Sequence, residues 1–212
     1  MLTANIMDNF TSALLLAFVA LFPLVNPVGA IPVFCSLTSN SSSEHRKKTA
    51  LKTAVNVFFI LLIFYFVGEF LLEFFGISMG VLKIAGGLIV ANTAWEMVTS
   101  KNKLSTEENT EIQSKEDISF TPMALPLLSG PGSIGVAIGL SFQGNQTGYT
   151  CGISAGIFLM AVTVYIALLL SLPLFKLLGK TGVGVLNRIM GFFILAIAVQ
   201  LIVNGIFMLA KN

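Results

Sequence analysis

One stretch decides the fold of this chain: residues 23–32, PLVNPVGAIP, which interrupt an apolar run of membrane length. A second interruption, PLLSGPGS, lies at residues 126–133. Proline removes a backbone donor and clashes with the preceding helical turn, and lipid offers no substitute hydrogen-bond partner. Both stretches therefore predict a helix that breaks at membrane depth and restarts around a protein-lined or wet site.

The composition places the chain among membrane proteins. Of its 212 residues, 55% are hydrophobic and only 10% are charged, against about 25% charged in ordinary soluble domains. The net charge of +2 is spread over several loops, which argues against a nucleic-acid partner because such partners select a concentrated basic face. The first ten residues contain no Lys or Arg, so they do not resemble a cleavable signal peptide.

Apolar stretches long enough to span a bilayer, which takes about 20 helical residues, predict an all-α transmembrane fold. Six such stretches occur, at residues 10–38, 53–75, 79–98, 119–142, 149–175 and 184–209. The first and the fourth contain the interruptions, so we expect these two helices to be discontinuous. A hydrophilic linker at residues 99–118 divides the six helices into two sets of three.

The two sets resemble each other. Residues 83–91, KIAGGLIVA, align with residues 188–196, RIMGFFILA, at a shift of 105, and Pro27 and Pro131 are 104 apart. We therefore expect two three-helix repeats, residues 1–98 and 119–212. Because three spans is an odd number, the second repeat should be inverted relative to the first, as in transporters that alternate access around a midplane site.

Charge predicts the orientation. With six spans, the loops after spans 1, 3 and 5 share one side of the membrane. These loops and the adjoining span ends hold ten of the twelve basic residues: Arg46, Lys47, Lys48, Lys52, Lys101, Lys103, Lys115, Lys176, Lys180 and Arg188. Basic loops stay cytoplasmic, so we expect the linker inside and both termini outside. Lys83 and Lys211 are the exceptions, and Lys83 is expected to snorkel from the start of its span.

Each interruption carries helix-start signals. Asn26 is a suitable N-cap and Pro27 a suitable first helical residue, while Ser129 and Gly130 supply the non-helical link before Pro131. A helix restarted in this way presents free amides and a partial positive charge, which favours an anion or a carboxylate. The expected site therefore consists of Asn26, Pro27, Val28, Gly29, Ala30, Ser129, Gly130, Pro131, Gly132 and Ser133. The alternative is two proline kinks whose backbone groups are satisfied by neighbouring helices.

The remaining intramembrane polar residues are few. Asn92 falls in the middle of its span and is added to the expected site, whereas Asn56, Thr163, Gln200 and Asn204 are suited to hydrogen bonds between helices. Glu69 is expected to form a structural ion pair near Lys83, with proton coupling as the alternative. The sequence contains no metal-binding cluster and no catalytic set, so neither a cofactor nor an enzyme is expected.

These residues carry a resemblance to the MarC family of small integral membrane proteins, which includes SnatA-type neutral amino-acid transporters. The matching stretches are VNPVGAIPVF at 25–34, FGIS at 75–78, KIAGGLIV at 83–90, ALPLLSGPG at 124–132 and RIMG at 188–191. The Asn-Pro-x-Gly motif of the family maps to Asn26, Pro27 and Gly29, and its Gly-Pro-Gly motif maps to residues 130–132. The resemblance implies a six-helix protein of a prokaryotic cytoplasmic membrane that moves small neutral amino acids such as glycine and alanine.

Two hypotheses follow. The first is a secondary transporter of small zwitterions, coupled to H⁺ or Na⁺, whose substrate carboxylate meets the restarted helices. The second is a scaffold or regulator that binds a partner through the linker at residues 99–119; a channel fits less well because no charged ring or filter-like repeat is present. The Phe-rich faces suit contact with lipid or with another protomer of a homo-oligomer, and composition does not separate these two. Direction of transport and the exact substrate are left open.

Overall fold

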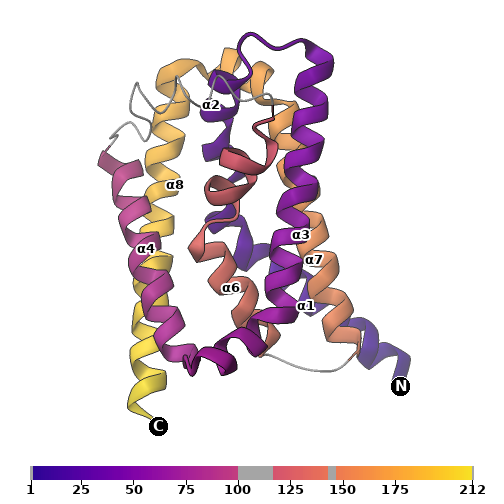
Figure 1. The fold of residues 1–212 in the computed structure, drawn as a ribbon, viewed down its shortest axis with the longest axis vertical. Coiled ribbons are helices and arrows are strands. Elements are labelled where there is room, and N and C mark those ends of the chain that lie inside the picture. Colours follow the sequence, from indigo (N-terminus) through magenta and orange to yellow (C-terminus); the bar gives the residue numbers. More distant parts are fainter. Residues whose placement is uncertain (1, 100–116, 143–146, 212) are drawn as a thin grey trace.

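Helices make up the fold of the part of the chain that the structure, a computed structural model, describes: residues 2–99, 117–142 and 147–211 (Figure 1). The elements in chain order are α1 (Leu2–Val25), α2 (Pro27–Leu37), α3 (Ser43–Phe75), α4 (Met79–Thr99), η1 (Ser119–Leu128), α6 (Pro131–Ser141), α7 (Thr147–Leu169) and α8 (Ser171–Ala210). The two ends of the chain lie at the same end of the helix bundle (Figure 1).

Four helices in the described ranges are each long and apolar enough to cross a membrane: α3, α4, α7 and the part of α8 from residue 181 onward. Two bent pairs bring the number to six if each pair forms one span. The pair α1 and α2 is bent by 45° and the pair η1 and α6 by 69°. The expected all-α fold is thus confirmed, and both expected interruptions coincide with a bend.

The boundary between the fifth and sixth spans differs from the expected one. The sequence predicts spans at residues 149–175 and 184–209, but α7 ends at Leu169 and α8 begins at Ser171. The apolar character continues through this boundary, so hydropathy alone does not reveal it. The backbone turns again at Gly179, which has φ 64 and ψ 177, a conformation that residues with a Cβ avoid.

The first piece of the fourth span is also different from the expected α-helical half. η1 is a wide π-type helix whose turns are closed from residue i to i+5: the Met123 amide donates to the Ile118 carbonyl (3.2 Å) and the Ser129 amide to the Ala124 carbonyl (2.7 Å). Two prolines in this piece have no amide to donate. The residue before each of them, Thr121 and Leu125, has extended backbone angles, as the proline ring requires.

Close helix packing depends on glycine. α1 and α7 run parallel, with Gly152 against the Phe10 carbonyl and Gly156 against the Leu14 carbonyl. α4 and α8 run antiparallel and lie side by side in Figure 1. Their seam pairs Gly80 with Gly205, Gly87 with Ala198, and Gly191 with Ala94. Small residues let helix backbones approach closely, which drives association in lipid.

The buried side chains form two separate clusters among the described residues. The larger one joins α1, α2, α3, η1, α6 and α7, whereas a small one of Val90, Ala94, Ile194 and Ala198 holds α4 to α8. The α4–α8 pair touches the rest of the bundle mainly where α8 meets α2 and α4 meets α6. The packing therefore divides the protein into a main bundle and a helix pair.

We expect Gly87→Ala to destabilise the protein and the neighbouring Gly86→Ala to be tolerated. A Cβ on Gly87 would lie 2.9 Å from the Ala198 carbonyl oxygen, whereas one on Gly86 meets nothing within 4 Å. Overpacking of this kind costs about 1–3 kcal/mol. Thermal unfolding of both variants in detergent measures the difference, and equal midpoints would contradict the packing of the α4–α8 seam.

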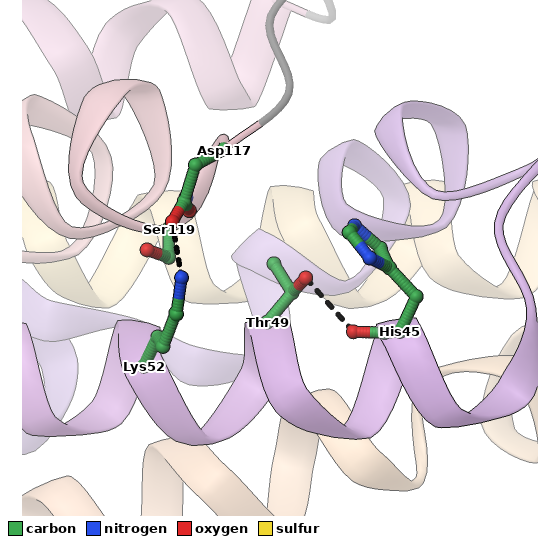
Figure 2. A network of polar contacts seen from close by, with 5 residues as sticks. All are labelled: His45, Thr49, Lys52, Asp117 and Ser119. Atoms are coloured by element: carbon green, nitrogen blue, oxygen red, sulfur yellow. Dashed lines mark hydrogen bonds and ion pairs between the residues drawn. The ribbon is translucent and has the colours of Figure 1, made fainter.

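A polar network fixes the start of η1 at the end of the bundle opposite the chain ends (Figure 2). Lys52 on α3 forms an ion pair with Asp117, whose other oxygen accepts a hydrogen bond from the Ser119 amide at 3.0 Å. Hydrogen bonds from Lys52 and Ser119 lower the pKa of Asp117 to about 2. The pair therefore anchors the entry of the broken span to α3.

This network predicts a dependence of stability on pH. The native pKa of Asp117 lies below its ordinary value of 3.8, so its contribution is complete above about pH 4 and is lost as the pH falls toward 2. Because both side chains are half exposed, we expect Lys52→Met to lower the unfolding free energy by only about 0.2–1 kcal/mol at pH 7. Chemical unfolding at pH 7 and near pH 2 should show that difference shrinking, and a constant difference would contradict the pairing.

Candidate functional site

The first break is centred on Asn26. Its backbone has φ 46 and ψ 65, a left-handed conformation between α1 and α2. Its side-chain Oδ1 accepts a hydrogen bond from the Gly29 amide at 3.0 Å, and its carbonyl accepts one from the Ala30 amide at 3.3 Å. Asparagine tolerates left-handed angles and caps helices well, so this residue serves both needs of the break.

As a result, the N-terminus of α2 is largely satisfied from within. Pro27 has no amide, and those of Gly29 and Ala30 already donate to Asn26. The amide of Val28 is the one in this turn to which the described residues give no partner. From the sequence we expect the amides of Val28, Gly29 and Ala30 all to be free to bind a ligand. Within the described ranges, only the Val28 amide of this turn is free.

The second break lacks the side-chain cap that the first break has. Gly130 is the N-cap of α6 and provides no side chain, and Pro131 follows as the first helical residue. The first amide of α6 with a helical partner is that of Ile134, which donates to the Gly130 carbonyl at 3.0 Å. The amides of Gly132 and Ser133 therefore stand in the uncapped first turn, which is where a helix offers donors to an anion.

Two hydroxyl groups lie at this second break. The Ser133 Oγ donates within the break, with the Gly130 carbonyl at 2.9 Å and the Leu128 carbonyl at 3.3 Å. Ser129 is fully buried, and its Oγ has no hydrogen-bond partner among the described residues. An unpartnered buried hydroxyl costs about 1–3 kcal/mol, so a membrane protein that retains one at a helix break is suited to receive a polar ligand there.

The two breaks lie close to each other and to α4. A Cβ added to Gly132 would lie 2.1 Å from a Val90 methyl carbon and 3.6 Å from Leu24 Cδ2, so the second break touches the end of α1. On the other side, the Asn26 amide nitrogen lies 3.7 Å from Met97 Sδ. Val90 and Met97 are neighbours of the site that the sequence analysis did not include, since only folding brings α4 to the breaks.

The other expected site residues are placed differently. Pro27, Ala30 and Gly132 are buried, Val28, Gly29 and Gly130 are half-buried, and Pro131 is exposed. Asn92 is exposed on α4, where its amide donates to Glu96 Oε1 at 3.1 Å, so it stands apart from the breaks.

Glu69 is half-buried on α3. The one ion pair within the described ranges joins Lys52 to Asp117, and the expected pair of Glu69 with Lys83 is not formed. The ammonium of Lys83 lies beside Met208 Sδ instead.

Comparison with known proteins identifies the family of the chain. The model of the MarC family of integral membrane proteins matches residues 11–210. The chain belongs to this family. The resemblance seen in the sequence is thereby confirmed, and the chain is an integral membrane protein.

Relatives of this chain are similar to it over nearly their full length. It is 38% identical to the UPF0056 membrane protein YhcE of Escherichia coli, over 89% of each chain. It is 37% identical to the UPF0056 membrane protein MJ1677 of Methanocaldococcus jannaschii, over 91% of this chain and 95% of the relative. The UPF0056 inner membrane protein MarC of Escherichia coli is 34% identical over 97% and 99%. No solved structure matches.

We expect substitutions of Asn26 to separate its two roles. Asn26→Ala removes the cap and places a Cβ residue without a polar group at φ 46, so it should lower the unfolding free energy by about 1–2 kcal/mol. Asn26→Gly also removes the cap but tolerates φ 46 without strain, so it should destabilise the protein less than Asn26→Ala. Thermal unfolding in detergent tests this order, and equal stability of Asn26→Ala and the wild type would contradict the cap.

Proposed function

We propose that the protein is a secondary transporter of small neutral amino acids, of the size of glycine or alanine, that binds its substrate between the two helix breaks. One observation carries the proposal: at the second break the uncapped first turn of α6 adjoins a fully buried Ser129 hydroxyl to which the described residues give no partner. Unsatisfied donors at membrane depth are costly unless a ligand uses them.

The chemistry of the break suits a zwitterion. The substrate carboxylate accepts from the amides of Gly132 and Ser133 and from the Ser129 hydroxyl, where the helix end adds about half a positive charge. The ammonium group donates to backbone carbonyls of the opened turn such as that of Leu128, because the Gly130 carbonyl already accepts from the Ile134 amide and the Ser133 hydroxyl. The described residues place no acidic side chain in hydrogen-bond contact with these groups, which fits a substrate without net charge.

The arrangement of the helices supports two inverted repeats, residues 1–98 and 119–212. Exchanging the halves maps the pairs of packed elements onto one another: α1 with α7 onto η1 with α3, α2 with α8 onto α6 with α4, and α2 with α7 onto α6 with α3. The pairs α4–α8 and α3–α7 map onto themselves. The third spanning helices of the two repeats, α4 and α8, then form the helix pair. In the proposed mechanism, transport consists of this pair rocking against the main bundle.

The membrane location follows from the relatives. One of them is named an inner membrane protein, and we infer the same cytoplasmic membrane for this chain. The start of α3, which carries Arg46 and Lys52, lies at the end of the bundle opposite the termini (Figure 1), which supports cytoplasmic loops there and both termini outside. The proposal involves no enzyme activity. Glu69 remains the candidate carboxylate for coupling to H⁺, and homo-oligomer formation stays unassigned.

The alternative, a membrane scaffold that acts through the linker, rests on residues 100–116, which lie outside the described ranges. It requires no ligand at the breaks. Calorimetry with the twenty amino acids separates the two hypotheses, because a scaffold gives no heat with any of them.

Ser129→Ala tests the transporter directly. The variant deletes a buried hydroxyl without a described partner, so it should fold at least as stably as the wild type. It should also raise the KM for glycine or alanine uptake into proteoliposomes by about tenfold, the equivalent of one hydrogen bond of about 1.4 kcal/mol.

The matched control is Ser171→Ala. Ser171 is also a fully buried serine, but it lies at the start of α8, where its side chain faces the Cys35 thiol. We expect this variant to transport normally. Equal uptake by the wild type and both variants would refute the site, and absence of uptake of any neutral amino acid by the wild type would refute the function.

A further inference from the structure

A cavity of about 160 Å³ separates the α4–α8 pair from the main bundle. Its walls come from four helices: α1 contributes Leu16, α4 contributes Lys83 and Gly86, α6 contributes Gly132 and Gly139, and α8 contributes Leu201. The volume is about five times the ~30 Å³ share of a water molecule in the liquid. It therefore suits a molecule of a few non-hydrogen atoms.

The cavity runs along α6 from the second break toward the end of the bundle that carries the termini. Gly132 lies in the first turn of α6 and Gly139 two turns further along, which separates them by about 10 Å along the helix axis. The space beside Gly135 and Gly139 is open, since a Cβ on either would meet nothing within 4 Å. α6 thus presents bare backbone to a path that leads away from the proposed substrate site.

The same path is closed on the other side of the breaks. Leu24 and Val90 both stand against Gly132, and Asn26 contacts Met97. Beyond that point α8 packs on α2. The packing around Gly132 is therefore tight on the side away from the termini and leaves space on the side toward them.

One charged side chain lines this otherwise apolar cavity. Lys83 is half-buried on α4, and the partner that the structure gives its ammonium is the thioether of Met208 at 3.4 Å. A thioether is a weak acceptor, and a cation at an apolar wall within a membrane span is costly without a good partner. Glu69 and Glu73 are the candidate counter-ions that precede it in the sequence, and neither makes an ion pair with it.

We propose that this cavity is the entry vestibule of the transporter and binds the substrate carboxylate to Lys83 before the carboxylate reaches the amides of Gly132 and Ser133. This inference rests on the proposed function for the identity of the substrate. The vestibule itself takes small carboxylates as a class. Lys83 is a positioning residue, because it holds the carboxylate about two helical turns from the final site.

Labelling of a cysteine at position 139 tests the vestibule. Gly139→Cys is made in a chain in which both native cysteines are replaced (Cys35→Ala, Cys151→Ser), and a membrane-impermeant methanethiosulfonate is applied to each side of the proteoliposomes in turn. We expect modification from the side of the termini. Alanine and propionate should slow it, and ethylamine, which lacks the carboxylate, should not.

Lys83 variants then test the role of the charge. Lys83→Met and Lys83→Gln should abolish protection by propionate and raise the KM for alanine uptake by about tenfold. Lys83→Arg should keep both. Lys211→Met is the matched control, because Lys211 lies at the end of α8 and does not line the cavity. Thermal unfolding of each variant shows that it is folded.

The outcomes separate this inference from the proposed function. Labelling from the opposite side only, no labelling from either side, or unchanged protection in Lys83→Met would overturn the vestibule, even if alanine is transported. Protection by propionate that depends on Lys83 in a protein that transports no amino acid would instead overturn the proposed function and support the vestibule as a carboxylate site.

Discussion

Every backbone group at membrane depth has to find its hydrogen-bond partner inside the protein, and the structure depends on this constraint. The first break satisfies it with a single residue, since Asn26 adopts the left-handed turn and also caps the helix that follows. In η1 the solution is different: Pro122 has no amide for the Ile118 carbonyl, and the turn widens so that the Met123 amide reaches that carbonyl instead. Both solutions keep the chain folded in lipid.

The difference between these two solutions is what gives the site its character. The self-capped N-terminus of α2 has few free hydrogen-bond donors for a ligand. The N-terminus of α6, in contrast, keeps the Gly132 and Ser133 amides and the nearby Ser129 hydroxyl available. Two breaks that look equivalent in sequence thus have unequal roles in the structure. The first shapes the turn and contacts the neighbouring helix through Met97, and the second leaves donors free for the carboxylate of the proposed substrate.

In the proposed transport mechanism, the α4–α8 pair is the body that moves. Its glycine seam is tight, while its contact with the main bundle leaves a cavity along α6. A well-packed pair that adjoins a loosely packed wall can shift as a unit, because its own contacts are kept during the shift. Lys83 lies in this wall, so movement of the pair would carry a bound carboxylate relative to the breaks.

Much of the fold could be predicted from the sequence. Proline, glycine and the length of the apolar runs determine where helices break and how many can span the membrane, because these are local properties of the backbone and its solvent. These sequence features predict both breaks at the correct positions. They do not predict the boundary at Leu170, because hydropathy does not change there. They also do not predict the π-type turns of η1, whose hydrogen bonds span five residues instead of four.

Tertiary structure decided the rest. Nothing local distinguishes Asn92, which faces away from the breaks, from Met97, which contacts Asn26 across 71 residues of sequence. Likewise, the sequence predicts that Lys83 snorkels to the membrane surface, whereas the packing of four helices places it on a cavity wall. The sequence by itself determined the helices, their interruptions and the family. Which side chains meet at the interruptions was decided only by helix packing, because contacts between distant segments depend on the relative rotation of whole helices.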